Sequence, residues 1–208
     1  VLTYAMHWPG RQRETARGLR RTPFYQALKA KGAVYTEMQG WERPGWFAPE
    51  GVAPVHDYAF GRPSWFDHAQ TEQKSAREGV VMIDYSMLGK HMVEGKDAET
   101  FLQRVFTNDV SIADGRVIYS LMLNERGGIE GDVTIARHDK THFMIMSAIS
   151  HTRRNRDHLQ HAILANEDVI IRDVTSAYAV LALSGPLSRA ALKTLVDISL
   201  SDKDFPPY

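Results

Sequence analysis

The residues of this chain that could carry chemistry lie on two neighbouring apolar-rich segments, 117–123 and 129–136. The first segment carries Tyr119, and the second carries Asp132 within an otherwise apolar, β-branched run. A carboxylate in such a run is costly unless it is solvated, hydrogen-bonded or functional, and aspartate is depleted in strands. Two interpretations of Asp132 therefore stay open: an exposed strand residue with an edge hydrogen bond, and an acid or base that faces a ligand.

The alternation of side chains along a strand restricts where Asp132 can point. It places Asp132, Thr134 and Ala136 on one face and Val133 and Ile135 on the other. If the two β-branched residues face the core, Asp132 faces solvent or a cavity. Tyr119 is open to two interpretations as well, a core ring with a bonded hydroxyl and a ligand contact.

The elements that would position these side chains can be predicted from the pattern of apolar residues and breaks. The polar break 124–128, which ends in Gly127-Gly128, predicts a β-hairpin over 117–136. Further strands are predicted at 80–84, 87–93, 143–146, 168–174 and 178–184, and helices at 22–32, 64–78, 97–106, 151–164 and 186–196. Hairpin-linked strands must be antiparallel, so we expect an α+β fold: an antiparallel meander with flanking helices.

The first 66 residues are expected to be an irregular arm or linker. Within it, Trp41, Trp46 and Phe47 alternate with proline and glycine, which predicts irregular structure over 40–49. The rings are expected to fill apolar holes elsewhere in the protein, and a base- or pterin-stacking platform is the alternative. Five arginines between 11 and 21 indicate a solvated arm that packs on a neighbour, with a phosphate- or nucleic-acid-binding patch as the alternative.

Composition limits the partners. Acidic and basic residues balance at 25 each, so we expect neither a nucleic-acid nor a membrane-surface partner. The chain has no cysteine, and no apolar run approaches the roughly 20 residues that span a bilayer. His138 and His142, like His158 and His161, are pairs without a third ligand, so no metal site is predicted. There is also no Gly-rich dinucleotide fingerprint or P-loop.

Several motifs, spread along the whole chain in a fixed order, carry a resemblance to a known family. They are Arg21–Tyr25, Gly40–Phe47, Arg62–Phe66, Arg77–Val80, Asp84–Ser86, Phe101–Arg104, Thr107–Val110, Asn124-x-x-Gly127-Gly128 and Leu183–Pro186. Together they resemble the folate-binding part of the dimethylglycine and sarcosine dehydrogenases, which is similar to the glycine-cleavage T-protein of the aminomethyltransferase family. The tryptophan-rich segment favours the dehydrogenase branch.

The resemblance implies an oxidoreductase that oxidises an N-methyl amine on FAD in a domain absent from this chain. It implies that the one-carbon unit then passes to tetrahydrofolate and gives 5,10-methylenetetrahydrofolate. Residues 67–208 would form the first part of the aminomethyltransferase-like folate-binding domain, incomplete at its C-terminus. The implied roles are Asp132 as the catalytic acid and Tyr119 and Leu88 as folate contacts. Gly131 stands where strict T-proteins carry the first of two acids.

The same resemblance sets further expectations and leaves rivals. The chain alone is expected to be inactive and to bind folate weakly, because the implied pocket is shared by three subdomains. The implied location is the bacterial cytoplasm or the mitochondrial matrix. Two alternatives remain: a folate-dependent demethylase of another methyl donor, and a non-catalytic folate-binding or organising module, which the loss of an acid at Gly131 favours.

Overall fold

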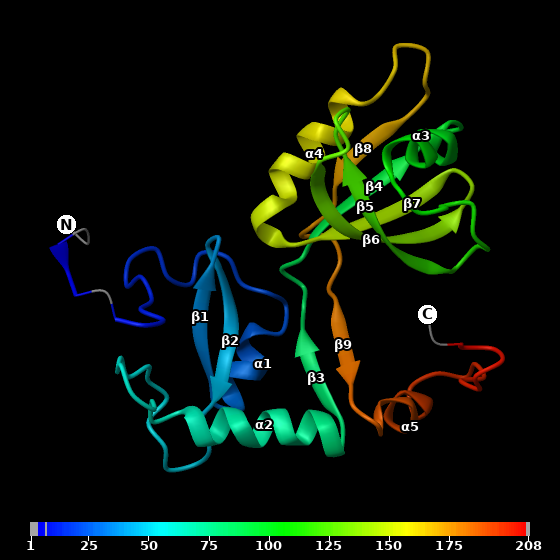
Figure 1. The fold of residues 1–208 in the computed structure, drawn as a ribbon. Helices are drawn as coiled ribbons and strands as arrows, with labels where there is room; N and C mark the ends of the chain where they lie inside the picture. Colours follow the sequence, from blue (N-terminus) through cyan, green and yellow to red (C-terminus); the bar gives the residue numbers. More distant parts are fainter. Residues whose placement is uncertain (1–3, 7, 207–208) are drawn as a thin grey trace. The chain divides into compact units, whose positions relative to one another are not determined.

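The computed structural model describes residues 4–6 and 8–206, and these residues form two compact units (Figure 1). Unit 1 consists of the described residues up to 85 together with residues 179–206, and unit 2 consists of residues 86–178. Unit 2 is therefore inserted between two parts of unit 1. The boundary predicted from the sequence, between an arm of 66 residues and a folate-binding domain over 67–208, stays a prediction.

Unit 1 contains a hairpin, a second strand pair and three helices. Its helices are α1 (Tyr25–Ala30), α2 (Phe66–Glu78) and α5 (Ser188–Lys193). Strands β1 (Ala33–Met38) and β2 (Trp41–Phe47) pair antiparallel, and so do β3 (Val81–Asp84) and β9 (Leu181–Ser184), which join the two parts of the unit. The predicted helix that ends before Gly79 and the predicted strands at 80–84 and 178–184 are confirmed.

The β1–β2 hairpin contradicts the expectation that residues 40–49 are irregular. Its turn is Gln39-Gly40, and both residues have positive φ, 53° and 82°, as in the two-residue turn whose twist suits antiparallel strands. Pro44 lacks an N–H, yet it fits, because the ladder shifts register between Val34 and Tyr35 and the sheet has only these two strands.

The tryptophans of this hairpin are buried within unit 1. Trp46 forms a small core with Val34 and Ala48, against which Trp65 packs. Trp41 is buried as well. Trp46 fills an apolar space, as predicted, but its partners Val34, Ala48 and Trp65 belong to the same first 66 residues and not to another part of the protein. A stacking platform is wrong for both tryptophans, because a buried ring offers no open face to a ligand.

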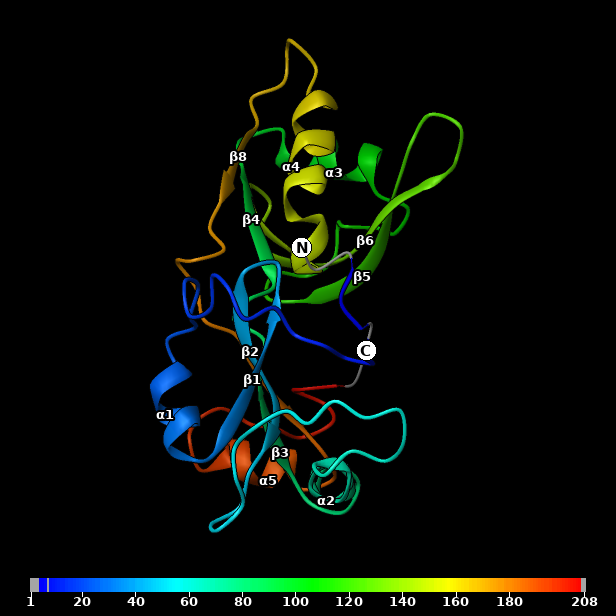
Figure 2. The same ribbon diagram turned by 90° about the vertical axis from the view of Figure 1, so that its left-hand side faces the viewer.

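Unit 2 is built on one five-stranded sheet with the strand order β5-β6-β7-β4-β8, in which every neighbouring pair is antiparallel. Its strands are β4 (Gly89–Glu94), β5 (Val117–Leu123), β6 (Ile129–Asp139), β7 (His142–Ser147) and β8 (Ile170–Asp173). The predicted meander is confirmed as β5-β6-β7. In Figure 2 the β5–β6 hairpin appears as a twisted ribbon that extends from the rest of the sheet.

One face of this sheet carries the core of unit 2. Helix α3 (Ala98–Val105) lies in the predicted range 97–106 and buries four apolar residues at helical spacing, Ala98, Phe101, Leu102 and Val105. Helix α4 (Thr152–His161), which follows the short 3-10 turn η2 (Ile149–His151), adds Leu159 to the same cluster. The cluster is completed by the inward strand residues Val93, Met122, Val133, Ile135, Phe143 and Ile145, and by Phe106 and Val110, which follow α3. Both helices therefore cover the same face of the sheet.

Candidate functional site

Tyr119 and Asp132 lie on the sheet face opposite the core. In the β5–β6 ladder Tyr119 is paired with Thr134, and Leu121 is paired with Asp132. Residues directly opposite each other share a face, so Tyr119 and Asp132 are diagonal neighbours, whose separation is typically about 7–8 Å. Val133 and Ile135 are buried in the core, so the alternation along the strand turns Asp132 away from it, and Asp132 is exposed.

A hollow of about 660 Å³ lies beside Tyr119 within unit 2. Its walls combine apolar, aromatic and polar side chains with one cation. The lining residues are Asn108, Ile112, Arg116, Val117, Ile118, Tyr119 and Thr134. Tyr119 keeps 56% of its surface exposed, so its ring serves as a wall of the hollow and not as a core residue. This volume lies in the range of about 300–1,000 Å³ that is typical of small-molecule sites.

Asn108 fixes one wall of this hollow by binding the edge of β5. Its side-chain Nδ2 donates to the carbonyl of Tyr119 (2.9 Å), and its backbone N–H donates to Ser120 Oγ (3.0 Å). The preceding residue, Thr107, donates its backbone N–H to the carbonyl of Leu121 (3.0 Å). The connection after α3 is therefore held along the strand that carries Tyr119, which limits the movement of that ring's backbone.

Asp132 lies on the same face but is not among the residues that line the hollow. Within the described part of the chain its carboxylate has no hydrogen bond and no ion pair, so both oxygens are available to a ligand. Leu88 lies outside the hollow too, half-buried in the segment before β4, where its carbonyl accepts a hydrogen bond from Lys90 Nζ (2.8 Å). The structure thus brings Tyr119 and Asp132 together on one face, and it does not place Leu88 in the lining.

The turn between β5 and β6 sets the register that makes these two residues neighbours. Asn124 Oδ1 accepts hydrogen bonds from the backbone N–H groups of Arg126 (3.0 Å) and Gly128 (2.9 Å). Gly127 has a φ of 77°, a conformation that glycine adopts at little cost. The motif Asn124-x-x-Gly127-Gly128 therefore has a structural role: it closes the hairpin.

Gly131 lies on the opposite face of β6 from Asp132. It is paired with the buried Met122, and a Cβ at this position would lie 3.0 Å from Asn155 Oδ1 and 3.2 Å from Met122 Cε. Asn155 is 1% exposed, and its Oδ1 has no hydrogen-bond donor among the described residues. An acid at this position would enter the core side of the sheet, so its absence removes nothing from the face that carries Tyr119.

Placing the missing acid at this position tests that geometry. The Gly131→Asp variant is expected to lose about 3 kcal/mol or more of its free energy of unfolding, because a buried carboxylate would meet the unpaired oxygen of Asn155. Urea denaturation followed by circular dichroism measures the loss. The control Lys140→Asp changes an exposed turn residue of the same sheet and should stay within about 0.5 kcal/mol of the parent chain. Equal stability of Gly131→Asp would show that a side chain at 131 reaches solvent.

The described residues contain neither a metal-ligand cluster nor a membrane-spanning helix. No group of three or more histidine, cysteine or acidic side chains in residues 4–6 and 8–206 is arranged to hold a metal ion. No helix in the same residues combines the length and the apolar character that a bilayer crossing requires.

Comparison with known proteins matches residues 24–208 to the family model of the GCVT N-terminal domain. The chain is similar to 4-methylaminobutanoate oxidase (formaldehyde-forming) from Paenarthrobacter nicotinovorans, with 38% identity over an alignment that covers 96% of this chain and 24% of the oxidase. It is 33% identical, over 99% of its length, to 24% of the mitochondrial pyruvate dehydrogenase phosphatase regulatory subunit of Mus musculus. It is 29% identical, over 98% of its length, to 26% of the mitochondrial sarcosine dehydrogenase of Homo sapiens. The chain thus spans about a quarter of the length of these relatives.

A solved structure shows the same fold. The glycine cleavage system aminomethyltransferase T from Bartonella henselae superposes on this chain with a TM-score of 0.65 and 22% sequence identity. The superposition covers 85% of this chain and 44% of the aminomethyltransferase chain. The resemblance drawn from the sequence motifs and the predicted α+β fold of the aminomethyltransferase type are thereby confirmed.

Proposed function

The chain belongs to the GCVT N-terminal domain family, and from this premise we propose that it forms the folate-binding portion of an FAD-dependent dehydrogenase of the dimethylglycine and sarcosine type. In this proposal an N-methyl amine is oxidised in a separate FAD domain, and the one-carbon unit passes to tetrahydrofolate bound by this chain. The observation that carries the proposal is the hollow beside Tyr119, which shares its sheet face with the unpaired carboxylate of Asp132. The bacterial cytoplasm or the mitochondrial matrix is the proposed location.

The residues around the hollow suit a flat, polar heterocycle. Ile112, Val117 and the Tyr119 ring offer apolar surface to the faces of such a ring, and the side chains of Asn108 and Thr134 can hydrogen-bond its edge. Tetrahydrofolate, when bound, supplies the nitrogen that accepts the one-carbon unit. The described residues around the hollow therefore fit this group.

Asp132 has the chemistry that transfer to a nitrogen requires. The attacking nitrogen loses a proton, and a carboxylate within reach can accept it as a general base. Asp132 is exposed and unpaired within the described residues, so no protein cation competes for its oxygens. We assign Asp132 the role of acid and base and Tyr119 that of a ring contact. Leu88 is assigned a second folate contact, outside the hollow.

A non-catalytic role is the second candidate function. It is favoured by the similarity to a regulatory subunit, with 33% identity over 99% of this chain. The position of Gly131 on the core face weakens the original reason for this candidate, because an acid lost there did not belong to the Tyr119 face. One-carbon transfer by the intact protein would exclude a purely organising role.

The contact made by the Tyr119 ring can be tested by binding. The Tyr119→Ala variant is expected to weaken binding of 5-formyltetrahydrofolate about 3- to 10-fold, since an aromatic contact contributes about 0.5–1.5 kcal/mol beyond its buried area. A nuclear magnetic resonance titration measures the dissociation constant even where binding is weak. Tyr178→Ala, an exposed tyrosine of unit 2 outside the hollow, is the matched control and should leave the constant unchanged. Equal constants for parent and Tyr119→Ala would remove Tyr119 from the proposed site.

A further inference from the structure

Unit 1 contains a second hollow, of about 380 Å³, between the segment that precedes α1 and the β1–β2 hairpin. The side chains that matter for its chemistry are those of Arg17, Arg21, Tyr25, Tyr35, Glu42 and His56. The sequence left open whether the arginines of this segment form a solvated arm or bind an anion. Their contacts in the structure differ from one arginine to the next.

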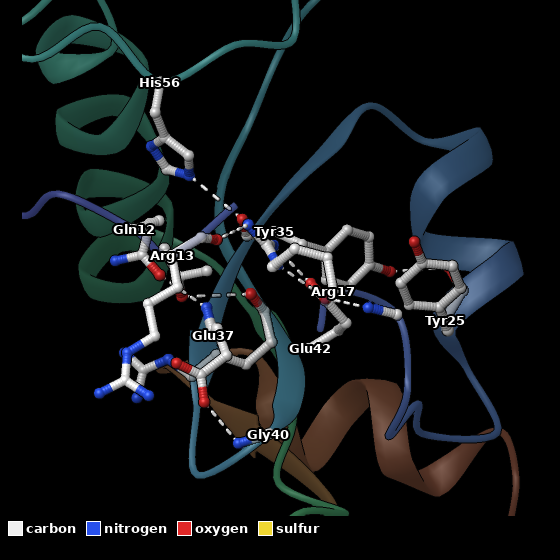
Figure 3. A network of polar contacts seen from close by, with 12 residues as sticks. Gln12, Arg13, Arg17, Tyr25, Tyr35, Glu37, Gly40, Glu42 and His56 are labelled. Carbon is white, nitrogen blue, oxygen red and sulfur yellow. Dashed lines mark hydrogen bonds and ion pairs between the residues drawn. The ribbon is translucent and has the colours of Figure 1, made fainter. Parts of the chain in front are cut away.

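Glu42 is the carboxylate of this hollow, and it is already neutralised. Its side chain is 3% exposed and accepts two hydrogen bonds from Arg17 (Figure 3). Arg17 Nε donates to Glu42 Oε1 (2.8 Å), and Arg17 Nη2 donates to Oε2 (2.6 Å). The backbone N–H of Gly18 donates to Oε1 as well (2.6 Å), and Arg17 Nη2 also reaches the carbonyl of Tyr35 (2.9 Å). Arg17 and Glu42 thus satisfy each other and contribute no net charge to the hollow.

Arg21 supplies the remaining positive charge. Its guanidinium lies over the ring of Tyr25, 4.7 Å from the centroid, which holds it in place by a cation–π contact. Among the described residues no carboxylate lies within ion-pair distance of Arg21. Its planar donor group is therefore available to a ligand, and such a group binds a carboxylate with two parallel hydrogen bonds.

One further donor lines the same hollow, the hydroxyl of Tyr25, which has no partner in the described part of the chain. His56 Nε2 lies 3.3 Å from the carbonyl of Tyr35, an acceptor, so the proton of a neutral His56 is on Nε2 and its Nδ1 is not a donor to a ligand. The Tyr35 hydroxyl donates to the carbonyl of Tyr25 (2.7 Å), and burial raises the pKa of Tyr35 to about 12, so this phenol adds no negative charge at neutral pH.

We propose that this hollow is a binding site for a small molecule that carries one carboxylate, with Arg21 as its counter-ion. Two arginines and one glutamate give the lining a charge of +1 when His56 is neutral, which matches a monoanion better than a phosphate. The rings of Tyr25 and Tyr35 and the side chain of Val34 provide apolar surface for the rest of the ligand. The site lies within unit 1 and is independent of the folate proposal, which concerns unit 2.

Benzoate is a suitable probe, and benzyl alcohol is its neutral counterpart. In nuclear magnetic resonance titrations of the chain, benzoate is expected to shift the signals of Tyr25 and His56 and to reach saturation, whereas benzyl alcohol at equal concentration causes no saturable shift. Inorganic phosphate is expected to bind more weakly than benzoate. Tighter binding of phosphate would overturn the carboxylate assignment, and a saturable response to benzyl alcohol would overturn the role of charge.

Variants locate the effect. Arg21→Gln is expected to weaken benzoate binding about tenfold or more, and Arg21→Lys, which keeps the charge but not the paired donors, should weaken it less. The matched control is Arg20→Gln: the neighbouring arginine lies over Trp41 and does not line the hollow, so binding should be unchanged. Unchanged binding by Arg21→Gln, an equal loss in Arg20→Gln, or no saturable binding by the parent chain would each overturn the proposal.

Discussion

Replacing Asp132 with asparagine is expected to lower the rate of one-carbon transfer to tetrahydrofolate by about 10²- to 10⁴-fold, the contribution that a positioned general acid or base typically makes. Asparagine keeps the size and hydrogen-bonding geometry of the side chain but cannot take up the proton. Amine oxidation in the proposed FAD domain should continue, because Asp132 belongs to a different part of the protein. The measurement is the yield of methylenetetrahydrofolate per amine oxidised, in the protein that carries both activities.

This variant should not disturb folding. Asp132 is exposed and has no hydrogen bond or ion pair within the described residues, so the midpoint of thermal unfolding should stay the same. Glu125→Gln is the matched control, because it neutralises another exposed acid of the same hairpin, at the turn. Its transfer rate should equal that of the parent protein. If Asp132→Asn transfers the one-carbon unit with unchanged yield and coupling, Asp132 does not have the assigned role.

Removing the carboxylate of Glu42 should destabilise unit 1 by about 2–4 kcal/mol, because the loss of one partner from a largely buried, hydrogen-bonded ion pair leaves the other without compensation. Arg17 and the N–H of Gly18 lose their acceptor in Glu42→Ala. Since Arg17 is 29% exposed, water offsets part of the cost. Urea denaturation monitored by tryptophan fluorescence measures the change, as Trp41 and Trp46 are both buried in this unit.

A surface ion pair of the same unit provides the contrast. Lys74 and Glu78 lie 3.9 Å apart on α2, with both side chains largely exposed, so Glu78→Ala should change the free energy of unfolding by less than about 0.5 kcal/mol from this pair. If Glu42→Ala proves no more destabilising than Glu78→Ala, the buried pair does not stabilise the attachment of the segment before α1 to the hairpin.

The Glu42 contacts also predict how stability depends on pH. The hydrogen bonds from Arg17, and after them the one from Gly18, lower the pKa of Glu42 against the opposing effect of burial. A lowered pKa in the folded state means that the stabilisation is fully present above the unfolded pKa of about 4.3 and is lost as the pH falls through the folded value. Glu42→Ala should therefore flatten the acid side of the stability curve, and an unchanged acid limb would contradict this.

The sequence was sufficient to predict most elements of unit 2 because their periodicity is strong. The apolar spacing of α3 and the alternation along β6 each correspond to one buried face in the structure. Strand β2 was missed because Pro44 and Gly45 are unfavourable in strands, and the irregularity that accommodates them depends on pairing with β1. No local signal in residues 41–47 reveals that partner.

The candidate site shows the same division between local and long-range information. Thr134 could be found from the sequence, since alternation places it on the face of Asp132. Asn108 and Arg116 could not, because they lie in the connection between α3 and β5, and only the folded chain brings that connection to the strand. The assignment of Leu88 came from resemblance, and the structure leaves it outside the hollow.

The pairing of β3 with β9 has a consequence for the order in which the protein forms during synthesis. All residues between these strands, 85–180, must leave the ribosome before the ladder can close. By then all residues of the β5-β6-β7 meander have been synthesised. We therefore expect unit 2 to acquire its structure on the nascent chain first, with the β3–β9 ladder as the last step, since the contacts most distant along the chain require the largest loop to close.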